Sequence, residues 1–177
     1  VASIPVGTNP MNLSFHPGGQ LVYCLNGRHG SDDISVIQVS DNTVIATIPV
    51  GDEPRGIAFT PNGKFGYVAN RGSDNISKIN CTTQAVVATI PLPGEPMDIV
   101  VTPDGEYAYV ATKGGGIRII DIATDAVVGS ISGLINCHSM IITPDGQFLY
   151  VSEADGTGTR VWKIEIASNS IVNSIAG

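Results

Sequence analysis

Few residues of this chain have the types and spacing that catalysis requires. Cys137 and His138 stand side by side, but a structural zinc site takes four ligands and no second pair repeats their spacing. No serine lies in a nucleophile elbow, so the sequence does not indicate a Ser-His-Asp triad. Nothing singles out two of the 16 acidic residues for glycoside hydrolysis. We therefore expect no catalytic residue, no metal ion and no cofactor.

A second set of residues suits binding better than catalysis. It mixes arginine, histidine, acids and small polar side chains, a combination that can hold a small polar ligand or a cation. Ordered water and ion pairs within the fold are the alternative explanation for the same residues. The set consists of Met11, Asn12, Asp52, Glu53, Arg55, Glu95, Met97, Asp98, His138, Ser139, Glu153 and Arg160.

The elements that position these residues follow from an internal repeat. An aromatic-rich run from Phe65 to Asn70 recurs along the chain, and its tyrosine appears as Tyr23, Tyr67, Tyr109 and Tyr150, at separations of 44, 42 and 41 residues. A period near 42 residues is typical of propellers and other repeat arrays. We expect the four tyrosines to occupy equivalent, largely buried positions.

Each repeat contains four short apolar segments separated by turns, and no helical period is present. A Pro-x-Gly turn such as Pro61-Asn62-Gly63 joins the first two segments, because proline presets φ and glycine accepts a positive φ. The pattern predicts an all-β propeller with four four-stranded antiparallel blades. A β-solenoid is the second architecture considered. The predicted blades span about 8–50, 51–92, 93–133 and 134–177, after a fourth-strand stub at 1–7.

The repeat resembles the YVTN β-propeller repeat. The resemblance rests on the run from Ile48 to Gly51, the run from Pro54 to Lys64, and the tetrad Tyr67-Val68-Ala69-Asn70. It covers essentially the whole chain in four copies. The resemblance implies a propeller of the kind found in archaeal surface-layer proteins and secreted bacterial proteins, and hence an extracellular, cell-surface or periplasmic location.

Comparison of the four copies separates two rims. The Pro-x-Gly turns and the turns between the third and fourth strands are uniform, which indicates a role in the fold. The loops between the second and third strands, such as Glu153 to Arg160, vary in length, as do the connections between blades. Function concentrates on such loops, although neutral drift would produce the same variation. We expect any partner on this variable rim, where the binding set clusters at the mouth of the central channel.

The composition argues against two kinds of partner, nucleic acid and the membrane interior. The net charge of −7, with only nine lysines and arginines spread along the chain, argues against nucleic acid. We see no transmembrane run and no signal peptide, and we expect no membrane insertion. The three cysteines form no disulfide framework, and we expect them to be small buried hydrophobic residues.

Four blades are too few for the larger rings that this family usually builds. We therefore expect half of an eight-bladed ring completed by a second copy, or part of a larger propeller; a tight four-bladed monomer is the alternative. The sequence favours a non-catalytic binding or structural scaffold. A fragment of a propeller enzyme, such as a lyase or a cofactor-containing periplasmic oxidoreductase, is the second hypothesis, because fold alone does not decide function.

Overall fold

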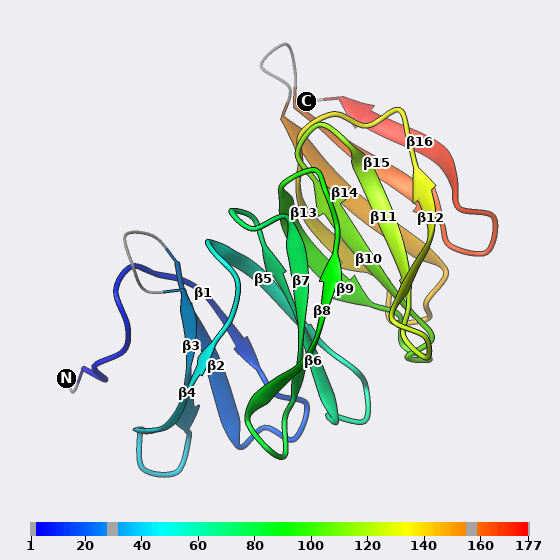
Figure 1. Ribbon diagram of the computed structural model, residues 1–177. Helices are drawn as coiled ribbons and strands as arrows, with labels where there is room; N and C mark the ends of the chain where they lie inside the picture. Colours follow the sequence, from blue (N-terminus) through cyan, green and yellow to red (C-terminus); the bar gives the residue numbers. More distant parts are fainter. Residues whose placement is uncertain (1–2, 28–31, 155–158, 177) are drawn as a thin grey trace.

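The computed structural model describes residues 3–27, 32–154 and 159–176. Within these residues the chain consists of strands and short turns, and no helix is present that could cross a membrane. The strands form four antiparallel sheets, each made of four strands consecutive in sequence (Figure 1). The all-β fold of four-stranded blades predicted from the repeat is confirmed. Part of the predicted variable loop from Glu153 to Arg160, residues 155–158, lies outside the described residues.

The first blade contains β1 (Pro10–Phe15), β2 (Leu21–Asn26), β3 (Asp33–Gln38) and β4 (Thr43–Pro49). The second contains β5 (Pro54–Phe59), β6 (Phe65–Asn70), β7 (Asn75–Asn80) and β8 (Ala85–Pro91). The third contains β9 (Pro96–Val101), β10 (Tyr107–Thr112), β11 (Gly116–Asp121) and β12 (Ala126–Ile131). The fourth contains β13 (Cys137–Ile142), β14 (Phe148–Ala154), β15 (Thr159–Glu165) and β16 (Ser170–Ala176).

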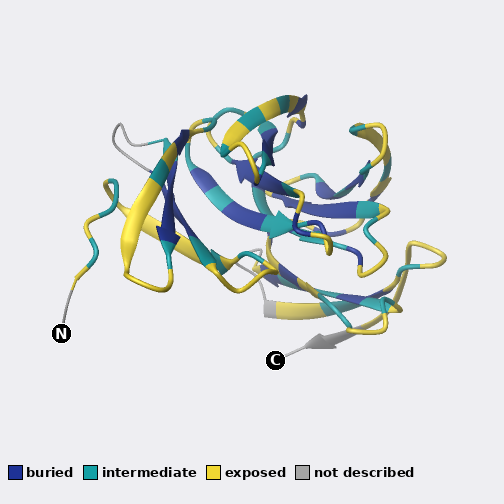
Figure 2. Ribbon diagram, turned by 90° about the horizontal axis from the view of Figure 1, so that it is seen from below, coloured by how far each residue is buried: buried dark blue, intermediate teal, exposed yellow. Residues whose placement is uncertain are grey.

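The blades follow one another in an arc that does not close into a ring (Figures 1 and 2). The first strand of each blade packs against the first strand of the next, whereas the fourth strands are farther apart. β1, β5, β9 and β13 therefore form the inner side of the arc, as expected for strands that line a propeller channel.

Three apolar clusters bury the faces between neighbouring blades. Tyr23 and Leu25 of the first blade pack with Ile57 and Val68 of the second, and the same arrangement recurs at the next two interfaces. Alternation along each strand sends successive side chains to opposite faces of a blade. The second and third blades, which each have two neighbours, therefore contribute to two clusters.

The tyrosines confirm this register at three of four positions. Tyr23, Tyr67 and Tyr109 are at most 2% exposed. Tyr150 is only half-buried, so the expectation of a buried position is wrong there. The reason is that Tyr150 faces outward from the fourth blade, where the described chain supplies no further blade to cover it.

The asparagine that ends the tetrad joins two strands within its blade. The buried Asn70 donates from Nδ2 to Asn75 Oδ1 and to Ser77 Oγ, both at 2.8 Å. Asn26 makes the same pair of bonds in the first blade, to Asp33 and Ser35. A buried amide is stable only when it is hydrogen-bonded, which explains why the tetrad ends in a donor.

Candidate functional site

Each blade has one residue of the predicted binding set at the same irregular position of its first strand. The pairing of the first strand with the second skips one residue at the start of each inner strand. Such a β-bulge bends the strand and re-aims a side chain. The skipped residues are Met11, Arg55, Met97 and His138, so the structure gives them equivalent locations at the start of the four inner strands.

The next residue along each inner strand ties neighbouring blades together. Asn12 donates from Nδ2 to the Arg55 carbonyl at 3.0 Å, across the first interface. Asp98 accepts from the Met140 backbone N–H at 2.8 Å, across the third interface, and from the Ile99 N–H at 2.9 Å. Burial raises the pKa of Asp98, although these N–H bonds oppose the shift. The carboxylate and amide are therefore used by the fold.

Glycine at the equivalent position of the second blade is a packing requirement. A Cβ built on Gly56 would lie 2.8 Å from Asp98 Oδ1. Ser139, the fourth residue at this position, is exposed, and its N–H donates to Ser152 Oγ at 3.1 Å.

A chain of alternating charges crosses from the second blade to the third. Glu53 contacts Arg55 at 3.6 Å and Arg71 at 3.1 Å. The Arg71 guanidinium also donates from Nη2 to Glu95 at 2.8 Å, and Lys113 lies 3.4 Å from the same carboxylate. The structure thus brings three predicted residues, Glu53, Arg55 and Glu95, into one network.

Arg71 is the centre of this network electrostatically. Its hydrogen bond to Glu95 lowers the pKa of that carboxyl, and the same bond raises the pKa of Arg71 itself. Both glutamates sit in left-handed backbone conformations, with φ of 51° at Glu53 and 53° at Glu95. Asparagine, which tolerates this region better, stands at the equivalent Asn9 and Asn136.

The other predicted residues lie apart from the network. Glu153 is 5% exposed and accepts from Trp162 Nε1 at 2.7 Å and from the Ile135 N–H, so it holds the fourth blade together. Arg160 lies over the Trp162 ring at 5.8 Å. Asp52 is exposed. From the sequence, these residues were predicted to lie on one rim. The sequence did not distinguish a buried, hydrogen-bonded carboxylate such as Glu153 from an exposed one such as Asp52.

Arg71 and Lys113 were missing from the predicted set. Both are the first residue after the second strand of their blades, where the first and fourth blades have Gly27 and Ala154. Basic side chains at two equivalent positions, beside glutamates of equivalent connections, are the sequence signal that identifies them.

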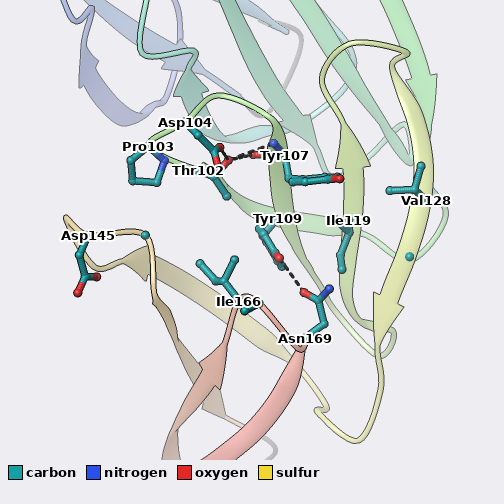
Figure 3. A pocket seen from close by; sticks show the side chains of 13 residues that line it. Thr102, Pro103, Asp104, Tyr107, Tyr109, Ile119, Val128, Asp145, Ile166 and Asn169 are labelled. Atoms are coloured by element: carbon teal, nitrogen blue, oxygen red, sulfur yellow. Dashed lines mark hydrogen bonds between the residues drawn. The ribbon is translucent and has the colours of Figure 1, made fainter.

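A hollow lies on the opposite rim, between the third and fourth blades (Figure 3). Its volume is about 610 Å³, within the range of small-molecule sites. The lining includes Thr102, Tyr107, Tyr109, Ile119, Ile166 and Asn169. Asp104 and Asp145 lie on the Pro-x-Gly turns beside the opening. From the sequence, we predicted only a role in the turns for this rim.

Burial and hydrogen bonds set the pKa values of the titratable groups in this region. Tyr109 donates to Asn169 Oδ1 at 2.7 Å, and burial raises the pKa of Tyr109 to about 12. Bonds from the hydroxyls of Thr102 and Thr143 lower the pKa values of Asp104 and Asp145. At neutral pH the hollow therefore presents a neutral phenol inside and two carboxylates beside its opening.

Within the described part of the chain, no three His, Cys, Asp or Glu side chains come close enough to hold a metal ion. Cys137 is buried, whereas His138 is exposed, so the adjacent pair does not converge on one point.

Comparisons with solved structures agree with the fold. The chain is similar to a chain of Kuenenia stuttgartiensis hydrazine synthase, with 26% identity and a TM-score of 0.90 over 96% of this chain and 49% of that one. The beta-propeller domain of Myceliophteria thermophila Cps50 (Swd1) has 10% identity and a TM-score of 0.82, over 99% of this chain and 57% of that one. The chain thus spans about half the length of these two.

No curated protein matches the chain. The YNCE-like beta-propeller family model matches residues 7–147, which include the first three blades and the start of the fourth. This match agrees with the YVTN-type repeat identified from the tetrads. The chain belongs to the YNCE-like beta-propeller family.

Proposed function

We propose that the chain is a non-catalytic binding scaffold, which contacts a partner through the rim that carries Arg55, Arg71 and Glu95. The observation that carries the proposal is the charge network centred on Arg71. Its two glutamates keep left-handed backbone conformations, which are costly for a residue other than glycine or asparagine. Residues held in such conformations cluster at functional sites.

The bulges support the same rim. They give Met11, Arg55, Met97 and His138 the same position at the start of each inner strand, and Arg55 joins the network through Glu53. Bulges that recur in every blade are designed features of a fold and often lie next to sites. The partner that fits balanced, closely spaced charges of both signs is a polar protein surface, because complementary charges give orientation and specificity.

The proposal also includes completion of the ring. The outward faces of the first and fourth blades are built like the faces that meet between blades, yet they expose Leu13 at 63% and Ile141 at 67%. The residues equivalent to Leu13 in the other blades, Ile57, Ile99 and Met140, are at most 8% exposed. For the 177-residue chain, we propose a second copy as the occupant of these faces.

The proposed location is extracellular, at the cell surface or periplasmic. This part rests on the resemblance of the repeats to those of surface-layer and secreted propellers. Fractionation of cells that produce the protein tests it. Recovery solely in the cytoplasmic fraction of the native host would contradict it.

In the second candidate function, the chain forms part of an enzyme. The similarity to a chain of hydrazine synthase, over 96% of the present chain, favours this candidate. If the chain forms part of an enzyme, that enzyme must turn over a substrate, and substitutions in the charge network must abolish the turnover. The scaffold requires stoichiometric binding without turnover.

The experiment for the rim compares two matched charge reversals. Arg71→Glu changes the network, whereas Lys64→Glu changes the charge by the same amount on the opposite rim. Cross-linking of the wild-type protein to its cell-envelope fraction, followed by mass spectrometry, identifies the partner and maps the linked residues. We expect cross-links near Arg71 and binding of the purified partner at least about tenfold weaker in Arg71→Glu, with little change in Lys64→Glu. The opposite ranking of the two variants would overturn the proposal.

A further inference from the structure

The hollow between the third and fourth blades is explained by comparison with the other two interfaces, where the equivalent space is filled by side chains. Each interface is built from equivalent residues, because the tyrosine of one blade donates to the left-handed turn residue of the next. The pairs are Tyr23 with Gln84, Tyr67 with Asp125 and Tyr109 with Asn169. The three sites can therefore be compared position by position.

At the first interface, aromatic rings occupy the space. His16 lies 5.5 Å from Phe59, and Phe59 lies 4.9 Å from Tyr23, as measured between ring centroids. His16 accepts from the Gly18 N–H at Nδ1, so Nε2 donates to the Gly63 carbonyl at 2.8 Å. At the third interface the positions of His16 and Phe59 are taken by the smaller Thr102 and Ile142.

At the second interface, an ammonium group occupies the space. Lys78 Nζ lies 2.8 Å from both carboxylate oxygens of Asp125. The same nitrogen lies over two aromatic rings, 4.4 Å from the centroid of Phe65 and 5.4 Å from that of Tyr67. Lys78 is 8% exposed, so this is a buried cation held by a carboxylate and two ring faces.

The fourth blade repeats the same pairing of a lysine with two rings. Lys163 Nζ lies 3.7 Å from the Phe148 centroid and 6.0 Å from that of Tyr150. Lys78 and Lys163 face their tyrosines across the second and third strands. The first blade has Leu21 in place of the first ring, so three blades have an aromatic pair, and two of these pairs already bind an ammonium group.

The third interface keeps the rings and the acceptor but has no lysine at the position of Lys78. Tyr107 and Tyr109 stand where Phe65 and Tyr67 stand, and Ile119 replaces Lys78 opposite the tyrosine. Asn169 Oδ1 accepts from Tyr109 and has a second lone pair for another donor. Figure 3 shows Tyr107, Tyr109, Ile119 and Asn169 around the hollow.

We infer that this cavity binds a small organic ammonium ion that carries an apolar group. The ammonium takes the place that Lys78 Nζ has at the second interface, between the tyrosine rings and Asn169 Oδ1. The apolar group lies against Ile119, Val128 and Ile166. The carboxylates of Asp104 and Asp145 beside the opening attract a cation and disfavour an anion.

The chemistry favours an organic cation over a metal ion. Hard metal ions take six to eight oxygen ligands, or six in octahedral geometry, whereas this cavity offers ring faces and aliphatic walls. Ring faces bind ammonium groups through their quadrupole, and quaternary or primary ammonium ligands are recognised in this way. The volume of about 610 Å³ accommodates a compact amine with one aromatic or branched aliphatic group.

The test uses 2-phenylethylammonium and its neutral counterpart, 2-phenylethanol, in titrations followed by calorimetry and by ligand-observed NMR. We expect saturable binding of the ammonium at least about tenfold tighter than that of the alcohol, because the charge is what the rings and acceptors recognise. Equal binding of the two, or no saturation by the ammonium below about 10 mM, would overturn the inference.

Three variants locate the site. Ile119→Lys supplies the ammonium from the chain and should abolish binding of the probe. Asn169→Asp makes the acceptor a carboxylate, like Asp125, and should tighten ammonium binding about tenfold without changing that of the alcohol. Lys78→Ile should create a second site of the same preference at the second interface.

Thermal unfolding confirms that each variant is folded before titration. Asn169 is exposed, so Asn169→Asp keeps the test decisive if Ile119→Lys does not fold. Unchanged affinity in Asn169→Asp, or retained binding in a folded Ile119→Lys, would place the probe elsewhere and contradict the inference.

Discussion

The Tyr67 hydroxyl donates to Asp125 Oδ1 at 2.9 Å, and this bond joins the middle of one blade to the outer turn of the next. Tyr67 is fully buried, and Asp125 lies at the left-handed position of the turn between β11 and β12. The equivalent bond recurs at the other two interfaces. The tyrosine of the repeat therefore fixes the position of each blade relative to the next one.

Tyr67→Ala should destabilise the chain by about 3–5 kcal/mol, as other deletions of large buried aromatic side chains do. Tyr67→Phe keeps the ring and removes the hydroxyl, and should cost about 1–2 kcal/mol. Tyr150→Phe in the Leu13→Arg background, which is expected to be a monomer, is the control, since no blade covers Tyr150 in the described chain. Urea unfolding measures all three. A loss below about 1 kcal/mol in Tyr67→Ala would show that the side chain does not support the interface.

Lys78 and Asp125 should be energetically coupled. Their side chains are 10% and 26% exposed, so solvent screens the pair only in part. Lys78→Met leaves a partly buried carboxylate without its cation, and should cost about 1–3 kcal/mol. A double-mutant cycle with Asp125→Asn gives the coupling directly. A coupling energy within about 0.3 kcal/mol of zero would mean that the ion pair does not join the blades.

Asn70→Asp tests the amide of the tetrad with an almost isosteric change. The variant removes the Nδ2 donor and turns a carboxylate toward Asn75 Oδ1, so we expect a loss of at least about 2 kcal/mol at pH 7. Asn80→Asp is the matched control. Asn80 uses only its oxygen, which accepts from the N–H groups of Thr82 and Thr83, and a carboxylate does this equally well. Similar losses in both variants would contradict the donor role.

The buried cysteines should resist alkylation and make the chain sensitive to alkaline pH. Burial raises the pKa of Cys137 from 9.0 to about 12, so its thiolate population at pH 8 is about a thousandfold below that of a free thiol. The pKa is raised on folding, so this stabilising contribution is complete below pH 9 and is lost as the pH rises from 9 toward 12. Iodoacetamide labelling at pH 8 and melting temperatures between pH 8 and 10 test this. Rapid labelling of the folded chain would contradict it.

The sequence predicts the blades well because each blade repeats the same local chemistry. Thr60 shows how: its hydroxyl bonds to Asn62 Oδ1 and accepts from the Phe65 N–H, which closes the Pro-x-Gly turn. The same bonds recur around Thr102 and Thr143. Such contacts span five residues or fewer, so a single repeat contains the information for them.

The site is less predictable because it depends on contacts between repeats. Arg71 bonds to Glu95, 24 residues away, and Asp98 bonds to the Met140 N–H, 42 residues away. Glu53, Arg55 and Glu95 were predicted as neighbours because the repeat places them at one rim. The cavity was missed because it results from a combination of residues: Thr102 where the first blade has His16, and Ile119 where the second and fourth blades have lysine. Only a comparison of side-chain size between repeats reveals it.

The two outward faces of the arc are complementary, and this relationship carries the last prediction. A hollow on the fourth blade is lined by Met140, Ile141, Tyr150 and Val161. At each interface within the chain, a side chain of the following blade fills the space that corresponds to this hollow; these side chains are Ile57, Ile99 and Met140. The equivalent residue of the first blade is Leu13, which is exposed. Asn42 is likewise equivalent to Gln84, Asp125 and Asn169, the acceptors of the tyrosine hydroxyls.

We therefore expect Leu13 and Asn42 of one copy to meet Tyr150 and Ile141 of another, twice in a two-fold symmetric ring. Light scattering coupled to gel filtration should give a mass of about 37 kDa, twice the 18.4 kDa of one chain. Leu13→Arg and Ile141→Arg should each yield the single-chain mass with little change in the unfolding of the monomer, because both side chains are exposed there. Val87→Arg is the control, since Val87 is 53% exposed on the outer strand β8 and should leave the dimer intact. A wild-type mass of one chain at micromolar concentration would rule out the second copy and leave these faces to blades from outside the 177 residues.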